Sequence, residues 1–386
     1  MVKKPGFGEP APGFTAPTPV NPKFHFDTAA GRNIVLAFLG HPLTDDAARL
    51  VAEVRAERAA FDDETLALFY VLSDPADAAR LGVAHEVPGL RYFMDYDRAV
   101  AAAYGRCDPA VGPGAPVEGG LVVMDRGLRV LQSLPLGGDR PPLSRLVQGL
   151  RRLTDWQAAD ASVGHAPVLV VERVFEPAFC RRLIDYYAAR GGDDSGFMRE
   201  TEGITVGVVD HGFKRRRDRQ IDDDRLVKEA IRRITGRLLP SIRRAFQFEA
   251  TRIERHIVAC YDAIEGGFFR PHRDNTTKGT AHRRFAVTLN LNAEEYEGGD
   301  LRLPEFGPRT YRAPTGGAVV FSCSLLHEAR PVTRGTRYAY LPFLYTDADA
   351  ELRERNKAFL DARSGGRAGL PAQTPDDTMG GGASEG

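Results

Sequence analysis

The order of apolar and polar positions divides the chain into two regions of different character. Near the start, a continuous apolar run at residues 34–39 precedes an amphipathic segment that opens with Thr44, Asp45 and Asp46. A continuous run is typical of a strand buried on both faces, and Thr44 with two acidic neighbours is typical of a helix N-terminus. Further strands are predicted at 66–72, 120–124 and 129–134, and a closing helix at 144–153. This alternation predicts an α/β domain.

After Thr251 the pattern changes to short apolar runs that are rich in β-branched and aromatic residues and are separated by Gly-Gly or Pro. Such spacing predicts a β-sandwich or barrel. Ahead of it, helices are predicted at 177–189 and 225–245, with a loop rich in Gly and charge at 191–224. A last helix is predicted at 347–362, and the composition of 365–386 is typical of a disordered tail.

The length of 386 residues suits two domains. We predict a first domain at 1–157, a linker at 158–167 where residues are small and large apolar side chains are scarce, a second domain at 168–346, and a C-terminal helix and tail at 347–386.

Composition excludes several classes of protein. Fifty-two basic residues balance fifty-two acidic ones, so nothing favours nucleic acid or an anionic membrane as the main partner. No apolar run approaches the roughly 20 residues of a spanning helix, and the first residues lack the apolar core of a secretory signal. The four cysteines are far apart without a CxxC pair, which argues against a disulfide framework or a structural zinc site. A cytoplasmic location is expected.

The chemistry concentrates in the second domain. His272 and Asp274 are two residues apart, and on an extended segment such positions project to the same side. His327 lies near the start of another predicted strand. Two imidazoles and one carboxylate on one face of a metal, with other positions open, form the facial triad of non-haem Fe(II) oxygenases.

Arg337 follows His327 by ten residues. If 325–331 and 336–345 are adjacent strands joined by the turn at Gly335, the Arg337 guanidinium points into the cavity of the triad. A guanidinium fork there suits bidentate capture of a carboxylate.

This ordered set resembles the 2-oxoglutarate- and Fe(II)-dependent oxygenases, and within them the prolyl 4-hydroxylase-like group, over about 168–346. The segments 255–261, 284–292, 297–304 and 316–321 fit the same resemblance. It implies a double-stranded β-helix (jelly-roll) with flanking helices. The residues implied in the site are His272, Asp274 and His327 as iron ligands, Arg337 on the far carboxylate of 2-oxoglutarate, and Tyr261 as a hydrogen-bond partner of the co-substrate.

The resemblance also implies the activity. It predicts hydroxylation of an aliphatic C–H bond of a peptidyl residue, an amino acid or a small metabolite, with release of succinate and CO2. L-ascorbate is expected to keep the iron reduced. Halogenases of the family lack the carboxylate, so Asp274 favours hydroxylation. Arginine at 337, where many prolyl hydroxylases use lysine, leaves the substrate class open.

Residues 8–153 resemble the peroxiredoxin/thioredoxin-like (redoxin) family, through the segments 8–14, 34–39 and 120–134. Peroxidases of this fold keep a cysteine in the first turn of the helix after the first strand. Here residues 41–46 read His-Pro-Leu-Thr-Asp-Asp and contain no thiol. We therefore expect a thioredoxin-like fold without peroxidase chemistry that docks a protein client. The alternative function is a redoxin-fold interaction module with an accessory or silent oxygenase domain.

Other candidates have a plainer interpretation. His282 could compete as a metal ligand, but a solvated turn is favoured. The basic run 214–219 could grip an acidic substrate or act as a lid, but a mobile, solvated loop is favoured. Cys107 has no evident partner, and Cys260 and Cys323 are expected to pack as small apolar groups.

Overall fold

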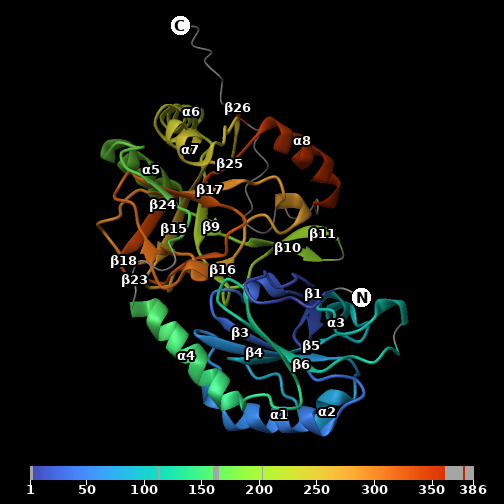
Figure 1. Cartoon of the computed structure of the whole chain (residues 1–386). Helices are drawn as coiled ribbons and strands as arrows, with labels where there is room; N and C mark the ends of the chain where they lie inside the picture. Colours follow the sequence, from blue (N-terminus) through green and yellow to red (C-terminus); the bar gives the residue numbers. More distant parts are fainter. Residues whose placement is uncertain (1–2, 112–113, 160–164, 202, 361–376, 379–386) are drawn as a thin grey trace. The chain divides into compact units, whose positions relative to one another are not determined.

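The computed structural model describes residues 3–111, 114–159, 165–201, 203–360 and 377–378. The chain forms two compact units, one of residues 1–165 with 304–308, the other of residues 166–303 with 309–386 (Figure 1). In the part that is described, no helix is both long enough and apolar enough to cross a membrane.

The N-terminal unit is built on a five-stranded sheet of order β5-β4-β3-β6-β7. Its strands are β3 (Asn33–Phe38), β4 (Leu66–Leu72), β5 (Leu90–Met94), β6 (Gly120–Met124) and β7 (Val130–Pro135). The strands β3, β4 and β5 run parallel to one another, whereas β6 and β7 are antiparallel additions. The remaining elements are the hairpin β1 (Thr15–Thr18) and β2 (Asn21–His25), the helices α1 (Asp45–Ala56), α2 (Asp77–Leu81), α3 (Ala99–Ala103) and α4 (Leu143–Ala159), and the short 3-10 helices η1 (Phe26–Ala29), η2 (Arg58–Ala60) and η3 (Pro109–Val111). A βαβ unit followed by a hairpin and a helix is the thioredoxin-like arrangement that the sequence predicted.

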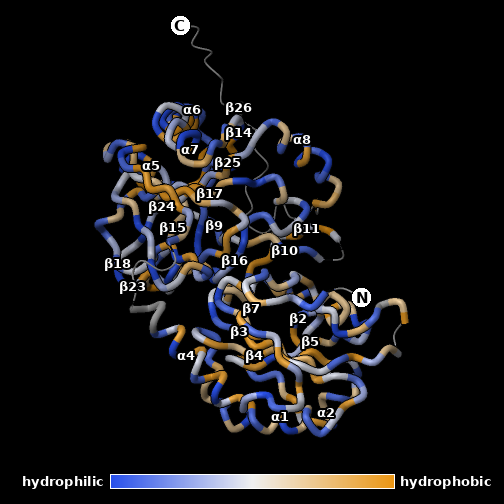
Figure 2. Tube along the Cα trace, viewed as in Figure 1, coloured by the Kyte–Doolittle hydropathy of each residue, from blue (hydrophilic) through white to orange (hydrophobic). Residues whose placement is uncertain are grey.

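Strand β3 is buried on both faces, as its continuous apolar run predicted. Val35 and Ala37 pack into a cluster with residues of α1 and α4, whereas Ile34 and Leu36 pack into an aromatic cluster on the other face. The run is visible as an apolar segment in Figure 2. Because both faces of the sheet are covered, this unit has a core of its own.

The C-terminal unit contains two principal sheets. The larger one holds, in order, β26 (Asp377–Thr378), β14 (Arg252–Glu254), β25 (Phe343–Tyr345), β17 (Phe285–Asn290), β24 (Thr336–Tyr340), β15 (Ile257–Asp262), β13 (Arg217–Gln220) and β9 (Asp193–Asp194), with β21 (Ala318–Ser322) and β8 (Leu169–Val171) branching from β17. The smaller one holds β12 (Lys214–Arg215), β16 (Phe268–His272), β22 (His327–Ala329), β19 (Leu301–Arg302) and β20 (Thr310–Tyr311). Two further pairs are β10 (Phe197–Thr201) with β11 (Ile204–Val208) and β18 (Glu297–Gly298) with β23 (Val332–Arg334).

Helices cover one face of the larger sheet (Figure 1). They are α5 (Pro177–Arg190), α6 (Asp224–Arg233), the π-helical η4 (Ile234–Leu238) and α7 (Leu239–Phe246); α8 (Asp347–Asn356) and the 3-10 helices η5 (Lys278–Thr280), η6 (Pro304–Phe306) and η7 (Lys357–Phe359) complete the described elements. Strand β15 shows the resulting alternation, since Val258 packs toward the helices while Ile257 and Tyr261 pack in an inner cluster with residues of the smaller sheet. The jelly-roll with flanking helices is thus confirmed.

The prediction of a loop at 191–224 is wrong, because this segment contains the strands β9 to β13. Within it the basic run is not solvated. Lys214, Arg216 and Asp218 are buried, whereas Arg215 and Arg217 are exposed. Burial of every second residue is typical of a strand that has one face toward the protein interior and the other toward solvent.

Two smaller differences concern the ends of predicted elements. Helix α4 extends to Ala159, into the range expected for the linker, of which 160–164 lie outside the described residues. The last helix ends at Asn356 with one further 3-10 turn. The predicted tail lies outside the described residues apart from 377–378.

Candidate metal centre and co-substrate pocket

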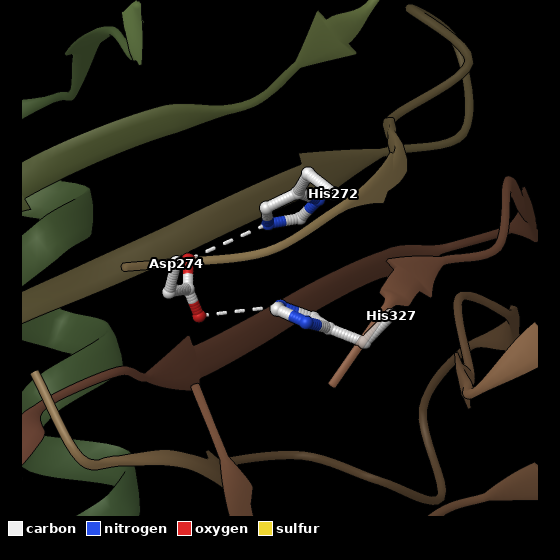
Figure 3. A group of neighbouring side chains, drawn as sticks. All are labelled: His272, Asp274 and His327. Carbon is white, nitrogen blue, oxygen red and sulfur yellow. Dashed lines mark ion pairs between the residues drawn. The ribbon is translucent and has the colours of Figure 1, made fainter. Parts of the chain in front are cut away.

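Three side chains converge at one point between the two sheets. His272 is the last residue of β16, His327 is the first of β22, and the two are register partners. His272 Nε2 lies 3.6 Å from Asp274 Oδ1, and His327 Nε2 lies 3.3 Å from Asp274 Oδ2 (Figure 3). One donor atom from each residue falls within 4.8 Å of the other two. This is the only group of three or more such donors among the described residues.

Backbone hydrogen bonds orient both imidazoles. His272 Nδ1 lies 2.7 Å from the Arg270 carbonyl oxygen, and His327 Nδ1 lies 3.0 Å from the Leu325 carbonyl oxygen. A carbonyl only accepts, so each Nδ1 must carry the proton. Each Nε2 then keeps its lone pair, aimed at the shared point, as a metal-binding histidine requires.

Packing fixes the positions of these ligands further. The Phe269 ring stacks on His272 with centroids 3.5 Å apart, and the Phe321 ring lies 4.6 Å from that of His327. Asp274 lies beyond the end of β16, outside the strand that carries His272. Its backbone N–H donates to the Cys323 carbonyl at 3.0 Å, which holds the carboxylate in place instead.

The charges of the triad suit a cation. Burial, with the nearby His327, lowers the pKa of His272 to about 4, so this imidazole is neutral at neutral pH. Burial opposes ionisation of Asp274, yet His327 and His272 hold the pKa of this carboxyl well below its usual range. Two imidazoles and one carboxylate are the donor set that Fe(II) takes in facial-triad sites, so these residues fit the metal.

Arg337 lies in the same cavity, though not for the reason predicted. Strands β22 and β24 are not neighbours but belong to different sheets. Strand β24 pairs with β15, where Arg337 is the register partner of Tyr261. Side chains of register partners on adjacent strands point to the same face of a sheet. Tyr261 and Arg337 therefore both face the inner side of the larger sheet.

The environment of Arg337 leaves its guanidinium available to an anion. The side chain is 3% exposed, and its Nε is buried without a hydrogen-bond partner among the described residues. Gly299 makes room for it, since a Cβ there would lie 2.8 Å from Val332 Cγ2 and 3.2 Å from Arg337 Cδ. The other two candidate arginines are unlike it. Arg330 and Arg334 are exposed, and neither lines the cavity.

The cavity that joins these groups has a volume of about 120 Å³. His272, Asp274, His327, Tyr261 and Arg337 all line it. Its apolar wall includes Phe197, Met198, Phe213, Phe269, Leu301, Phe321, Leu341 and Phe343. A cavity with an apolar side and convergent polar groups is typical of a small-molecule site.

Sequence reasoning missed a buried polar network on the cavity wall. Arg216 Nη2 donates to Asp218 Oδ2 at 2.6 Å, and Arg216 Nη1 donates to the Tyr261 hydroxyl at 3.3 Å. Lys214 Nζ donates to Ser195 Oγ at 2.7 Å and to the Gly196 carbonyl at 2.6 Å. All six residues from Lys214 to Arg219 are charged, so the alternation of buried and exposed positions appears only in the structure and not in the sequence.

His282 is not a solvated residue, as had been favoured, nor a member of the triad. It is 1% exposed, and its Nε2 lies 2.8 Å from Glu254 Oε2. Arg283 holds the same carboxylate with two hydrogen bonds, of 2.7 and 3.0 Å. The role of His282 is therefore structural.

The cysteines behave as packing groups. Cys107 and Cys323 are buried, and burial raises the pKa of both thiols. Burial likewise raises the pKa of Cys260 to about 11. At the start of α1, where redoxin peroxidases carry their thiol, Thr44 occupies the N-cap position.

Comparison with known proteins agrees with this site. Residues 256–345 match the family model of the 2OG-Fe(II) oxygenase superfamily. The matched stretch contains Tyr261, Arg337 and the three converging ligands. A PKHD-type hydroxylase of Pseudomonas fluorescens strain Pf-5 is 34% identical over 128 residues, which are 31% of this chain and 54% of that protein. The chain spans about half or less of the length of the first curated relatives that it matches.

Solved structures similar to parts of the chain include a Trichoplax adhaerens prolyl hydroxylase in complex with a peptide fragment of hypoxia inducible factor. It covers 55% of this chain and 96% of its own, at 17% identity and a TM-score of 0.38. Mycobacterium tuberculosis AhpC covers 41% of this chain and 98% of its own, at 14% identity and a TM-score of 0.32.

Proposed function

We propose that this protein is an Fe(II)- and 2-oxoglutarate-dependent dioxygenase that hydroxylates an aliphatic C–H bond. The observation that carries the proposal is the convergence of two oriented Nε2 atoms and one carboxylate in a cavity that also holds the buried cation of Arg337. When bound, Fe(II) and 2-oxoglutarate supply the oxidation, in which O2 places one oxygen atom in the substrate and one in succinate, with release of CO2.

His272, Asp274 and His327 bind the metal and leave its remaining positions to the co-substrate and O2. The two carbonyl-bound Nδ1 protons keep both imidazoles in the metal-binding tautomer. The aromatic and aliphatic side chains of the cavity wall limit the access of water to the reacting groups.

Arg337 binds the far carboxylate of 2-oxoglutarate. Its guanidinium carbon lies 5.0 Å from the centre of the Tyr261 ring, which orients the fork. The Tyr261 hydroxyl is already an acceptor for Arg216, so it can donate its own proton to a co-substrate oxygen.

The proposal is tested by loading the full chain with Fe(II) without oxygen, adding 2-oxoglutarate, and measuring succinate after exposure to air. Succinate formation that needs both Fe(II) and 2-oxoglutarate, and that increases with ascorbate, is expected. Asp274→Ala removes a ligand and should abolish it, whereas Asp194→Ala, at an exposed carboxylate, should not. Succinate formation at the normal rate in Asp274→Ala would refute the assignment.

A second function is proposed for the N-terminal unit, which has a thioredoxin-like sheet but Thr44 where a peroxidase has its thiol. Without that chemistry, the unit is proposed to dock a protein client. Capture of one defined protein by the full chain, lost on substitution of residues in this unit alone, would support it. Client binding that persists after such substitutions would refute it.

A further inference from the structure

The wall of the metal cavity carries more basic side chains than binding of the proposed co-substrate requires. Its basic side chains are Lys214, Arg216, Arg255, Arg273, Arg283 and Arg337, whereas Asp274 is the one acidic side chain among the described residues that line it. Cations placed in a partly dehydrated cavity are costly unless an anion faces them.

Two of these cations are neutralised by the protein itself. Arg216 is paired with Asp218, with 2.6 Å between Nη2 and Oδ2. Arg283 is paired with Glu254, with 2.7 Å between Nη2 and Oε1. Neither guanidinium therefore needs a ligand.

Lys214 and Arg255 are not neutralised in this way. The direct partners of Lys214 Nζ are Ser195 Oγ and the Gly196 carbonyl, and Ser195 Oγ in turn donates to Asp218, the carboxylate that pairs with Arg216. Arg255 donates Nε and Nη2 to the Leu341 carbonyl, at 3.1 and 3.0 Å. Among the described residues, no carboxylate oxygen pairs with either side chain within 4.0 Å.

The charges of the metal site and co-substrate already balance without these two residues. Two positive charges on Fe(II) and one on Arg337 equal one negative charge on Asp274 and two on 2-oxoglutarate. Lys214 and Arg255 are left over, as is Arg273, which donates Nη1 to the Ser324 carbonyl. Burial, Arg216 and Arg255 all lower the pKa of Lys214, while burial and Arg216 lower the pKa of Arg255 to about 10.

Arg255 also lies at the end of the cavity away from Arg337. Strands β15 and β24 pair from Tyr261 and Arg337 at one end to Val258 and Tyr340 at the other. Arg255 binds the carbonyl of Leu341, four residues along the chain from Arg337, or about 13 Å at the rise of a strand. A co-substrate held by Arg337 therefore leaves the Arg255 end unoccupied.

We infer that the substrate of this enzyme carries a carboxylate group, which Arg255 binds at the end of the cavity opposite Arg337, while Lys214 adds a second positive charge from the cavity wall. The inference rests on the proposed function and narrows its substrate class. Residues 256–345 match the oxygenase family model, and Lys214 and Arg255 both lie before this stretch. The two cations are therefore outside the part of the cavity wall that the family model covers. The aromatic and aliphatic side chains of that wall suit an apolar body behind the carboxylate.

The test measures binding without turnover. The full chain is loaded with redox-inert Zn(II) and saturated with 2-oxoglutarate, so that the Arg337 end is filled. Binding of 4-methylpentanoate is then compared with that of its primary amide by ligand-observed NMR. The acid is expected to bind at least tenfold more tightly than the amide, which has the same shape without the charge.

Three substitutions test which residues bind the carboxylate. Arg255→Gln keeps hydrogen-bond donors for the Leu341 carbonyl and removes the charge, and Lys214→Met removes the second charge. Each should weaken binding of the acid at least tenfold and leave the amide unchanged. Arg215→Met, the exposed neighbour of Lys214 on the same strand, is the matched control and should bind the acid within twofold of the original chain.

Equal binding of acid and amide together with no binding of the acidic peptide described below, or unchanged binding in both Arg255→Gln and Lys214→Met, would overturn the inference. A parallel binding measurement with the peptide acetyl-Gly-Glu-Gly-amide distinguishes a carboxylate of a peptide side chain from that of a small acid. Binding of the peptide but not of the small acid would assign it to an acidic side chain. Succinate formation by the Fe(II) enzyme is measured in parallel, so a failed substrate class and a failed oxygenase assignment give different results.

Discussion

Tyr261 and Arg337 are register partners on the antiparallel strands β15 and β24, and the guanidinium carbon lies 5.0 Å from the centre of the tyrosine ring. A second guanidinium, that of Arg216, lies 5.7 Å from the same ring and donates to its hydroxyl. One aromatic side chain thus orients two cations on the cavity wall. Of the two, only Arg216 has a carboxylate partner, Asp218, so Arg337 is the cation available to 2-oxoglutarate.

Arg337→Ala should weaken binding of 2-oxoglutarate by about 2–4 kcal/mol, the range for removing one member of a buried charge pair, and should leave iron binding nearly intact. Arg337→Lys should recover part of the loss, because a point charge attracts the carboxylate without the two parallel hydrogen bonds. Succinate release measured against 2-oxoglutarate concentration checks both. Arg334→Ala, at an exposed side chain, is the control. An unchanged affinity in Arg337→Ala would contradict the assignment of Arg337 to the co-substrate.

His272→Ala should abolish stoichiometric Fe(II) binding, because it removes one of three ligands. His282→Ala should keep the metal and lower the melting temperature, since it removes a buried partner of Glu254. Iron retained after anaerobic desalting, with a thermal melt of each variant, measures the two effects separately. His211→Ala, at an exposed imidazole, serves as a control for both. Loss of iron in His282→Ala with the fold intact would contradict the assignment.

The sequence predicts the three candidate ligands partly from local spacing and partly from the order of its motifs. His272 and Asp274 stand two residues apart, and His327 opens the strand that pairs with β16. The reason given for Arg337 was nevertheless wrong. Its strand was taken as the neighbour of β22, whereas β24 hydrogen-bonds to β15 and β17 in the other sheet. The residue reaches the same cavity because the two sheets face each other, and strand order in a jelly-roll is set by contacts distant in sequence.

The buried network was not predicted for a related reason. A run of five cations and one aspartate between Lys214 and Arg219 has the composition of a solvated loop. What buries alternate members is pairing with β15 and β16, which begin some 40 residues later or more. Lys214 then meets Ser195 and Gly196 from an earlier segment. The run is charged at every position, so neither its composition nor its residue pattern carries a trace of these contacts.

Asp218→Asn should destabilise the C-terminal unit by about 3–5 kcal/mol, the usual cost of breaking a buried pair, because Arg216 and Lys214 would lose their nearest carboxylate. Glu265→Gln offers a matched control. It breaks the pair of Glu265 with Arg217, where both side chains are about half exposed and the expected loss is about 0–1 kcal/mol. Urea unfolding of the full chain measures the difference. Equal losses in the two variants would show that the Arg216–Asp218 pair contributes no more than a surface one.

Glu254 should make stability depend on pH on the acid side. Burial opposes its ionisation, yet Arg283 and His282 hold the pKa of this carboxyl well below 4.5. A depressed pKa in the folded state adds stability that is fully present above 4.5 and is lost as pH falls through the folded value. Unfolding free energy measured between about pH 3 and 6 should therefore fall with acid less steeply in Glu254→Gln. Parallel curves for the two proteins would contradict this.

The N-terminal unit should not act as a thiol peroxidase. At the start of α1 there is no thiol, and Asp45 and Asp46 occupy the helix's first turn, where their charges would oppose a thiolate. Cys107 is no substitute, since burial and the neighbouring Asp95 raise the pKa of its thiol, and its Sγ lies 3.8 Å from the Arg98 carbonyl oxygen. Hydrogen peroxide consumption by the metal-free full chain with a thioredoxin reductant should equal that of Cys107→Ser. Faster, saturable consumption that disappears in Cys107→Ser would show that this unit retains redox chemistry.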